Sequence, residues 1–367
     1  MGNSLVFKLI SLNTRMATKN DTRMDTYDHT KLSNVNTCPT WGILRYSHHK
    51  KMPGASRAMA LEAGIAAHEC FAAVRWYQYR YYQCKTATQE ENAEMHGQRL
   101  FGNYRFDAML KAINDNSASR TNVINFALEA LERGDFYDDI SDKRRTISNI
   151  SEGVIAYADA YDMERYPIWI RDPTDPFTDI GIEIAFDIVV DIEYEDDRGK
   201  HDMSVRFTGK LDGLQHDALR DDTLIIIDDK TGSRIDDNWL SQWMLSQQLT
   251  GYCLAATTFT GLECNNAQAW GMKLPVGNIA HESVRKEPVN RHPIMYNNWA
   301  NWFVTSIETE QRWRDHIFDA PQYTHSCNRY FSVCSFLPFC AAHSIEEKKQ
   351  IYEEMEYDEW TPLEEKA

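Results

Sequence analysis

The pattern of apolar and polar positions predicts a helical first half of the chain and a strand-rich second half. A long helix is predicted over about 56–83, and residues 88–166 are expected to be mostly helical with polar breaks near 114–120 and 134–144. We find no catalytic cluster in 88–166. This part is therefore interpreted as a helical region, about 85–170, inserted into the fold.

Strands are predicted in the second half. The stretches IGIEIAFDIVVDIEYED and DMSVRFTGKLDG alternate apolar and polar positions, whereas TLIIIDDK is a short, buried, β-branched run. An amphipathic helix over 237–258, a strand in NAQAWGMKLPVG that we expect at a sheet edge, and a helix around 294–316 follow. This order predicts a mixed sheet with helices and fits either the α/β or the α+β class.

Composition and local polarity suggest three parts. Residues 1–30 are expected to be a polar leader, because they lack a clear periodic pattern after one apolar patch, SLVFKLISL. That patch is too short to cross a membrane. Residues 31–345 form the main domain. Residues 346–367 are acidic and are expected to be a solvated helical tail, with occupation of a binding groove as the alternative.

The hairpin over 205–232 carries the clearest candidate chemistry. Side chains alternate along a strand, so Asp228 and Lys230 share a face and Asp229 points the other way. An antiparallel return would set Asp212, which we place at the end of the preceding strand, beside Asp228. Asp212, Asp228 and the Asp229 carbonyl could hold magnesium, with Lys230 near the attacking water. The alternative is an ordinary surface turn with charged ends.

Four motifs in a fixed order resemble the PD-(D/E)XK nuclease superfamily, in particular the RecB-like branch that includes phage exonucleases and CRISPR adaptation nucleases. They are GIAAHE, GKLDG, IIIDDKTG and QLTGY. The resemblance implies the α/β class, with a restriction-endonuclease-like core of a mixed central β-sheet flanked by helices, and the use of Mg²⁺ or Mn²⁺. The resemblance implies roles in metal ligation and in positioning water and DNA for these residues: His68, Asp212, Asp228, Lys230, Gln248 and Tyr252. Glu183 stands where such proteins often carry a glutamate. Without the other motifs, His68 would be read as a packed helical histidine, and Gln248 and Tyr252 as core-edge residues.

Residues 31–60 contain lysines, arginines and histidines but no Asp or Glu, in a chain whose net charge is −16. The overall charge excludes a general nucleic-acid-binding surface, so any DNA contact must be local. Arg45, Lys50, Lys51 and Arg57 are the candidate phosphate contacts. A solvated basic loop is the alternative.

The chain has eight cysteines, three of them in the C-terminal stretch CNRYFSVCSFLPFC at intervals of seven and six residues. This spacing leaves open structural thiols, zinc with a distant fourth ligand, or an iron–sulfur cluster. Iron–sulfur members of the resembled branch have one cysteine before the core and three after it. The resemblance therefore implies a [4Fe-4S] cluster on Cys38, Cys327, Cys334 and Cys340, a clip that joins the N- and C-terminal parts.

Together these features predict a metal-dependent DNA nuclease, by resemblance an exonuclease on single-stranded or end-containing DNA. The alternative is a catalytically silent nuclease fold that binds DNA or inhibits a partner. No GXXXXGK[ST] loop is present, so a helicase or recombination protein would be a separate partner. We expect no membrane segment and a cytoplasmic setting, in a bacterium or a phage-infected host.

Overall fold

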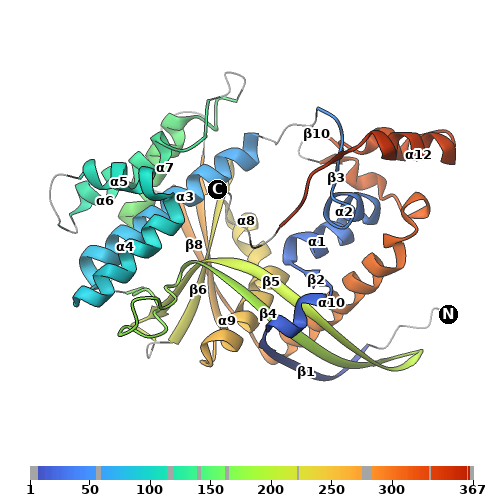
Figure 1. The fold of residues 1–367 in the computed structure, drawn as a ribbon, viewed down its shortest axis with the longest axis horizontal. Helices are drawn as coiled ribbons and strands as arrows, with labels where there is room; N and C mark the ends of the chain where they lie inside the picture. Colours follow the sequence, from blue (N-terminus) through green and yellow to red (C-terminus); the bar gives the residue numbers. More distant parts are fainter. Residues whose placement is uncertain are drawn as a thin grey trace. The chain divides into compact units, whose positions relative to one another are not determined.

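In the computed structural model (Figure 1), the chain forms two compact units. Unit 1 comprises Met1–Ser56, Asp187–Gly209 and Pro293–Glu364, and unit 2 is built mainly from Arg57–Phe186 and Lys210–His292. The structure describes residues 7–54, 59–113, 117, 119–138, 142–161, 165–220, 223–274, 283–329, 332–361 and 363. Two long strands, β4 (Ile182–Asp196) and β5 (Gly199–Asp217), have residues in both units.

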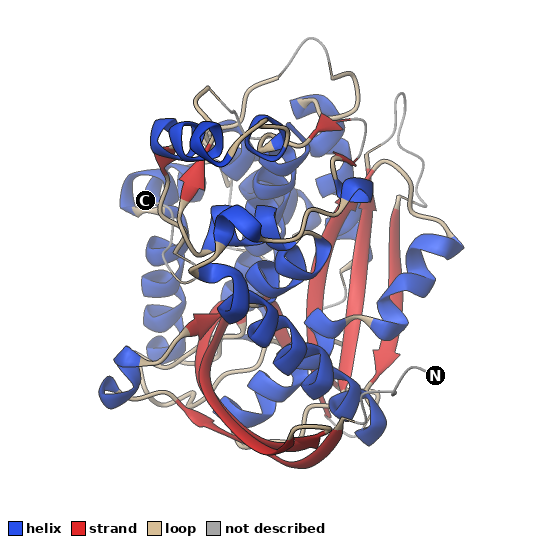
Figure 2. Ribbon diagram, turned by 90° about the vertical axis from the view of Figure 1, so that its right-hand side faces the viewer, coloured by secondary structure: helices blue, strands red, loops and turns tan. Residues whose placement is uncertain are grey.

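The sheet of unit 2 has the strand order β5-β6-β7-β8 and is mixed. Strand β6 (Thr223–Gly232) pairs antiparallel with β5 and parallel with β7 (Asn266–Lys273), and β7 pairs antiparallel with β8 (Val284–Asn290). Figure 2 shows straight strands running side by side, next to long strands that curve strongly. The parallel β6–β7 step requires a crossover, which runs through helix α9 (Gln247–Thr260).

Five helices of unit 2 precede the sheet in the chain and share a core with it. They are α3 (Met59–Gln78), α4 (Ala87–Phe101), α5 (Asn103–Lys111), α6 (Arg120–Glu132) and α7 (Ile147–Ala160). Ile225 and Ile227 of β6 and Trp270 of β7 are buried among their side chains. This confirms the mixed α/β fold with a central sheet flanked by helices.

Two local expectations about the strands differ from the structure. Asp212 lies within β5, which continues to Asp217, and does not end the strand. The expected edge strand, β7, is internal, and the edge is β8, whose mixed charges did not give a clear strand pattern.

The single helix expected over 237–258 is interrupted. Helix α8 (Asp237–Ser241) is followed by the 3₁₀ turn η3 (Gln242–Leu245), and Ser246 then caps α9 by accepting a hydrogen bond from the Leu249 N–H. A serine N-cap favours starting a new helix because its hydroxyl satisfies a free backbone donor.

Unit 1 contains a strand where a polar leader was expected. Strand β1 (Lys8–Met16) pairs antiparallel with β4, and β2 (Thr26–Tyr27) pairs parallel with β5. The helices α1 (His29–Thr37), α2 (Pro39–Tyr46), α10 (Pro293–Arg314), α11 (Leu337–Cys340) and α12 (Ile345–Glu354) complete the unit. Two short antiparallel ladders join its loops. Strand β3 (Lys50–Lys51) pairs with β11 (Glu356–Tyr357), and β9 (Asn328–Arg329) pairs with β10 (Ser332–Val333).

None of the helices within the described ranges has the length and apolar character needed to cross a lipid bilayer.

A buried ion pair ties α3 to the central strands of unit 2. The guanidinium of Arg75 contacts the Asp229 carboxylate, and both residues have no exposed surface. Tyr157 of α7 donates to the other Asp229 oxygen at 3.0 Å, and Arg75 also donates to the Asp212 carbonyl at 3.3 Å. A Cβ on Gly213 would lie 3.2 Å from Arg75 Nε, so glycine at this position leaves room for the guanidinium. This network fixes β5 and β6 against the helical layer.

A second anchor holds the start of β4. His96 of α4 is 3% exposed, and its Nδ1 lies 2.7 Å from the Arg99 guanidinium, which can only donate. The proton is therefore on Nε2, which donates to the Ile182 carbonyl at 3.0 Å. Burial, reinforced by Arg99, lowers the pKa of His96 to about 3, so the imidazole stays neutral.

We expect the substitution Arg75→Met to lower the free energy of unfolding by about 3–5 kcal/mol, because it leaves the Asp229 carboxylate buried without its cation. Urea denaturation measures this change. The double substitution Arg75→Met/Asp229→Leu removes both charges and is expected to recover part of the loss. A single-variant loss below about 1 kcal/mol would contradict the importance of the pair.

We expect His96 to make the protein acid-sensitive. Its pKa is near 6.5 in the unfolded chain and about 3 when folded, so between these values only the unfolded chain binds the proton. Stability falls as pH decreases through this window, by about 2 kcal/mol between pH 7 and pH 5. His96→Gln should remove that part of the pH dependence of unfolding. The exposed control His343→Gln should retain it, and equal pH dependence in all three proteins would refute the assignment.

Candidate metal centre

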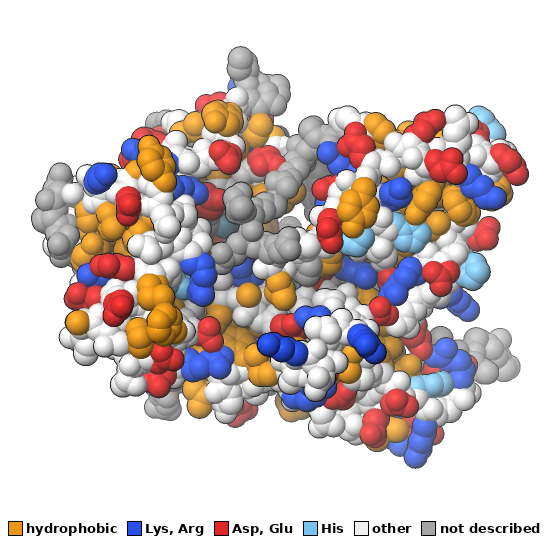
Figure 3. Space-filling view, in the orientation of Figure 1, with side chains coloured by type: hydrophobic (Ala, Val, Ile, Leu, Met, Phe, Trp, Pro, Cys, Tyr) orange, Lys and Arg blue, Asp and Glu red, His pale blue; other side chains and the backbone are white. Residues whose placement is uncertain are grey.

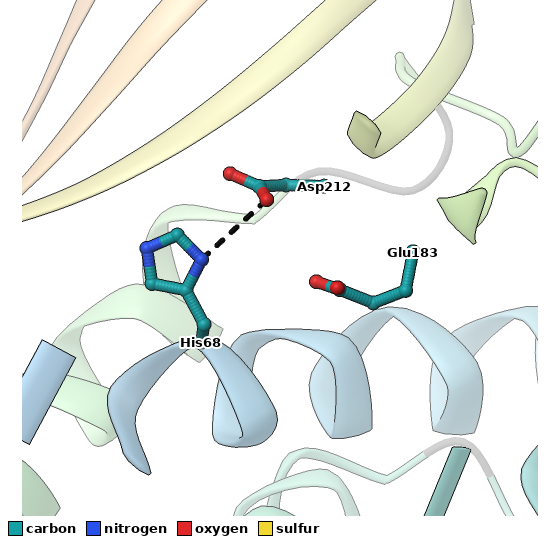
Figure 4. A group of neighbouring side chains, drawn as sticks. All are labelled: His68, Glu183 and Asp212. Carbon is teal, nitrogen blue, oxygen red and sulfur yellow. Dashed lines mark ion pairs between the residues drawn. The ribbon is translucent and has the colours of Figure 1, made fainter. Parts of the chain in front are cut away.

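Three possible metal ligands from three elements of unit 2 converge: His68 of α3, Glu183 of β4 and Asp212 of β5 (Figure 4). One ligand atom from each lies within 4.8 Å of the others, and no other such group occurs among the described residues. The Nδ1 of His68 lies 3.5 Å from Asp212 Oδ1. An imidazole and two carboxylates are a donor set that suits a divalent cation.

Glu183 adopts a backbone conformation that is rare for a side chain of its kind. Its φ is +50°, the left-handed region, which strains a non-glycine residue. The turn before it is tight, because Gly181 lies so close to the Leu214 carbonyl that any Cβ there would overlap it. The His96 hydrogen bond to Ile182 holds the same turn. The fold thus maintains this strain, which directs the Glu183 carboxylate toward His68 and Asp212 (Figure 4).

Strand β6 presents its polar residues on alternate faces. Lys230 Nζ lies 2.7 Å from Asp228 Oδ2, whereas the Asp229 carboxylate points to Arg75. The Asp229 N–H donates to Asp212 Oδ2 at 2.7 Å, which links the two strands at the level of the cluster. The pairing of Gly213 with Ile227 brings Asp212 opposite Asp228. As expected, Asp228 and Lys230 lie on one face of β6 and Asp229 on the other. The expected antiparallel pairing that sets Asp212 beside Asp228 is also present.

The charges of the cluster shift one another's protonation. Burial would lower the pKa of His68, but the attraction of Asp212 outweighs it and raises the pKa to about 9. The same pair holds the pKa of Asp212 well below its usual value, against its burial. Burial raises the pKa of Asp228 to about 6, with Lys230 opposing this rise and Asp212 adding to it. Because a ligating imidazole must be neutral, a cation binding here displaces the His68 proton.

The residues of the cluster fit a divalent cation. Glu183 Oε2 pairs with Lys210 Nζ at 2.7 Å, but its buried Oε1 has no hydrogen-bond partner among the described residues. A buried carboxylate oxygen without a partner is costly, and a cation would satisfy it. The negative groups Glu183, Asp212 and Asp228 thus supply oxygen ligands of the type that Mg²⁺ and Mn²⁺ prefer.

Gln248 and Tyr252 lie on one face of α9, as their spacing predicts. The Gln248 amide donates to the Tyr252 hydroxyl at 3.0 Å, and the Tyr252 ring packs edge-on against Phe186 with centroids 5.7 Å apart. Tyr252 is only 9% exposed. Their proposed contact with substrate stays a prediction.

The basic stretch in unit 1 lies against the acidic C-terminal segment. Arg45 pairs with Asp358 at 2.9 Å, Lys51 lies 3.8 Å from Glu356, and Lys50 Nζ lies 4.6 Å from the Tyr352 ring centroid. Arg57 lies outside the described residues. In the view of Figure 3, acidic and basic side chains are interspersed and do not form one basic face. Contact with phosphate by these residues is therefore still untested.

Four cysteines of unit 1 line one small cavity, together with Trp41, Phe336 and Leu337. They are Cys38, Cys327, Cys334 and Cys340. Cys38 precedes the Pro39 that starts α2, and the Cys334 N–H donates to the Cys327 carbonyl at 2.9 Å. The fold thus brings together residues that lie more than 280 positions apart in the chain. A nearby example is Thr40, whose Oγ1 donates to the Pro321 carbonyl.

Sequence reasoning left the role of Glu183 uncertain and did not identify Lys210 or Arg75. Lys210 could have been found, because it lies two residues before Asp212 on the same strand face. Arg75 stands in an aromatic helical run with no local signal of its distant partner.

Two comparisons with known proteins bear on these observations. A search of curated proteins returned no match. The family model described as the PD-(D/E)XK nuclease superfamily matches residues 29–341, a span that includes the whole metal cluster and the β5–β6 hairpin. With a match over most of its length, the chain belongs to the PD-(D/E)XK nuclease superfamily.

Proposed function

We propose that this protein is a metal-dependent DNA nuclease whose centre comprises His68, Glu183, Asp212, Asp228 and Lys230. Membership of a nuclease superfamily implies phosphodiester hydrolysis. The observation that carries the proposal is the convergence of His68, Glu183 and Asp212 within 4.8 Å next to the Asp228–Lys230 pair. Chance surface acids would not share one site with a half-buried lysine and a histidine.

Each residue has a role that its position suits. His68, Glu183, Asp212, Asp228 and the Asp229 carbonyl would hold Mg²⁺ or Mn²⁺, which when bound acts as a Lewis acid and activates water. The Lys230 ammonium, whose pKa is raised by Asp228 against the effect of burial, stays charged and orients water or a phosphate oxygen. Gln248 and Tyr252 would contact the DNA backbone.

The motifs favour a RecB-like exonuclease that acts on single-stranded or end-containing DNA. In this proposal Arg45, Lys50, Lys51 and Arg57 bind phosphates, and the acidic segment that lies against the first three must yield to DNA. A separate helicase or recombination protein would supply unwinding, in a cytoplasmic setting.

We also propose that Cys38, Cys327, Cys334 and Cys340 hold a [4Fe-4S] cluster that braces unit 1. Their shared cavity supports this assignment. A zinc ion held by the same four thiolates is the alternative.

We expect Asp212→Asn and Asp228→Ala to reduce Mg²⁺-dependent cleavage of end-labelled DNA more than the 10- to 100-fold that loss of an outer-shell partner typically costs. The reason is that each removes an anionic metal ligand. Asp202→Asn is the matched control, because Asp202 is an exposed aspartate on the same strand. Equal cleavage by wild type and Asp228→Ala would indicate contamination, and DNA binding without cleavage by the wild type would favour a silent nuclease fold.

We expect anaerobically purified protein to be coloured and to contain about four iron atoms per chain. Cys340→Ser should lose iron and the visible absorption, whereas Cys84→Ser, outside the cavity, should keep both. Absorption spectra with iron and zinc analysis test this. A colourless, zinc-loaded wild type would refute the cluster.

A further inference from the structure

A short segment of unit 2 that follows the β5–β6 hairpin and helix α8 exposes large apolar side chains. The 3₁₀ turn η3 contains Trp243, which is half-buried, Met244, which is 54% exposed, and Leu245, which is 76% exposed. Large apolar groups turned toward solvent in one turn are unusual unless they meet a ligand or partner.

The Trp243 ring is supported by a second tryptophan. Trp239 of α8 lies edge-on to Trp243, with centroids 5.3 Å apart and planes at 67°. Trp239 itself lies over Gly271 of β7 so closely that a Cβ at Gly271 would fall 2.5 Å from its ring. The glycine at 271 thus leaves room for the Trp239 ring, and Trp239 in turn supports the Trp243 ring.

The backbone of the turn is also anchored. Arg291, only 3% exposed, donates to the carbonyls of Trp243 at 3.1 Å and Met244 at 2.7 Å. It further donates to the Ser246 carbonyl at 3.3 Å, where α9 begins. These bonds satisfy backbone acceptors at the end of the turn and restrict its movement. A half-buried aromatic ring held in this way is preorganised for binding.

The ring lies beside the lysine of the proposed catalytic centre. Lys230 Nζ is 5.6 Å from the Trp243 ring centroid and 2.7 Å from Asp228 Oδ2. A flat π surface and a cation are therefore adjacent. A nucleotide carries the complementary pair, because its base offers a flat π face and its phosphate a negative charge. An apolar protein partner would gain nothing from the cation.

We propose that Trp243 is a stacking platform for the base of the nucleotide whose phosphate reaches Lys230, and that the site therefore selects single-stranded DNA. Bases within a duplex are already stacked on both faces and would have to be unpaired first, which costs energy. This inference rests on the proposed nuclease function and identifies the substrate form that the centre accepts.

The test uses the full-length protein and fluorescence anisotropy with labelled single-stranded oligonucleotides, with calcium in place of magnesium. Trp243→Ala should weaken binding by about 5- to 150-fold, the equivalent of one lost stacking contact. Trp243→Phe should retain most of the affinity. It keeps an aromatic face, and the Trp243 indole N–H has no hydrogen-bond partner among the described residues. Leu245→Ala, in the same turn, is the non-aromatic control.

A second measurement on the wild type requires no variant to fold. Oligonucleotides with a single abasic site moved along the strand should show one position at which losing the base weakens binding. Trp243→Ala should be insensitive to the abasic site at that position. The stacking role would be overturned if Trp243→Ala bound DNA as tightly as the wild type. It would also be overturned if Trp243→Ala and Leu245→Ala lost affinity equally and no abasic position weakened binding.

The result can be separated from the nuclease proposal. Mn²⁺ affinity, measured by calorimetry, should be unchanged in Trp243→Ala and weakened in Glu183→Gln. If no protein cleaves DNA but the abasic effect persists, the nuclease function fails and the stacking site stands. If cleavage depends on Asp212 but DNA affinity depends on neither Trp243 nor the abasic site, the nuclease function stands and the stacking site fails.

Discussion

The geometry of the centre depends on one buried ion pair, Arg75 with Asp229. Both side chains are fully enclosed, so the pair can satisfy its charges in only one arrangement. Asp229 must point into the helical layer, and strand alternation then turns Asp228 and Lys230 to the other face. The Asp229 N–H meanwhile holds Asp212. An interaction that does no chemistry itself thus determines which side chains are available for it.

Local rules of strand geometry explain how much of this was predictable. The opposite faces of Asp228 and Asp229 follow from the two-residue period, and the pairing of Asp212 with Asp228 follows from a short antiparallel return. The mixed sheet and the order of strands β4 to β7 after the helices were also predictable from the apolar pattern, whereas strands β1 and β8 were not. The helix break at Ser246 was not, because the amphipathic pattern continues across it and the Arg291 contacts that fix the turn come from a distant strand end.

Glu183 shows why the remainder of the site could not be derived from sequence. Its position follows from a left-handed backbone that Gly181 and the His96 hydrogen bond support, and none of these is visible in the alternation of β4. The strain at Glu183 is maintained by packing over a wide sequence range. Similarly, Arg75 acts through partners that only the folded chain brings near.

The interleaving of the two units in the chain has a consequence for protein synthesis. Unit 1 takes its residues from three separate stretches, the last of which begins at Pro293, whereas the sheet and helices of unit 2 are complete by His292. The ribosome therefore delivers every strand of the metal-binding sheet before α10 exists. Strands β1 and β2 can already pair with β4 and β5 at that stage, whereas helices α1 and α2 still lack α10, against which they pack. Because compact units tend to fold as they emerge, unit 2 can close first, and α1 and α2 are then the part of the N-terminal stretch that is buried last.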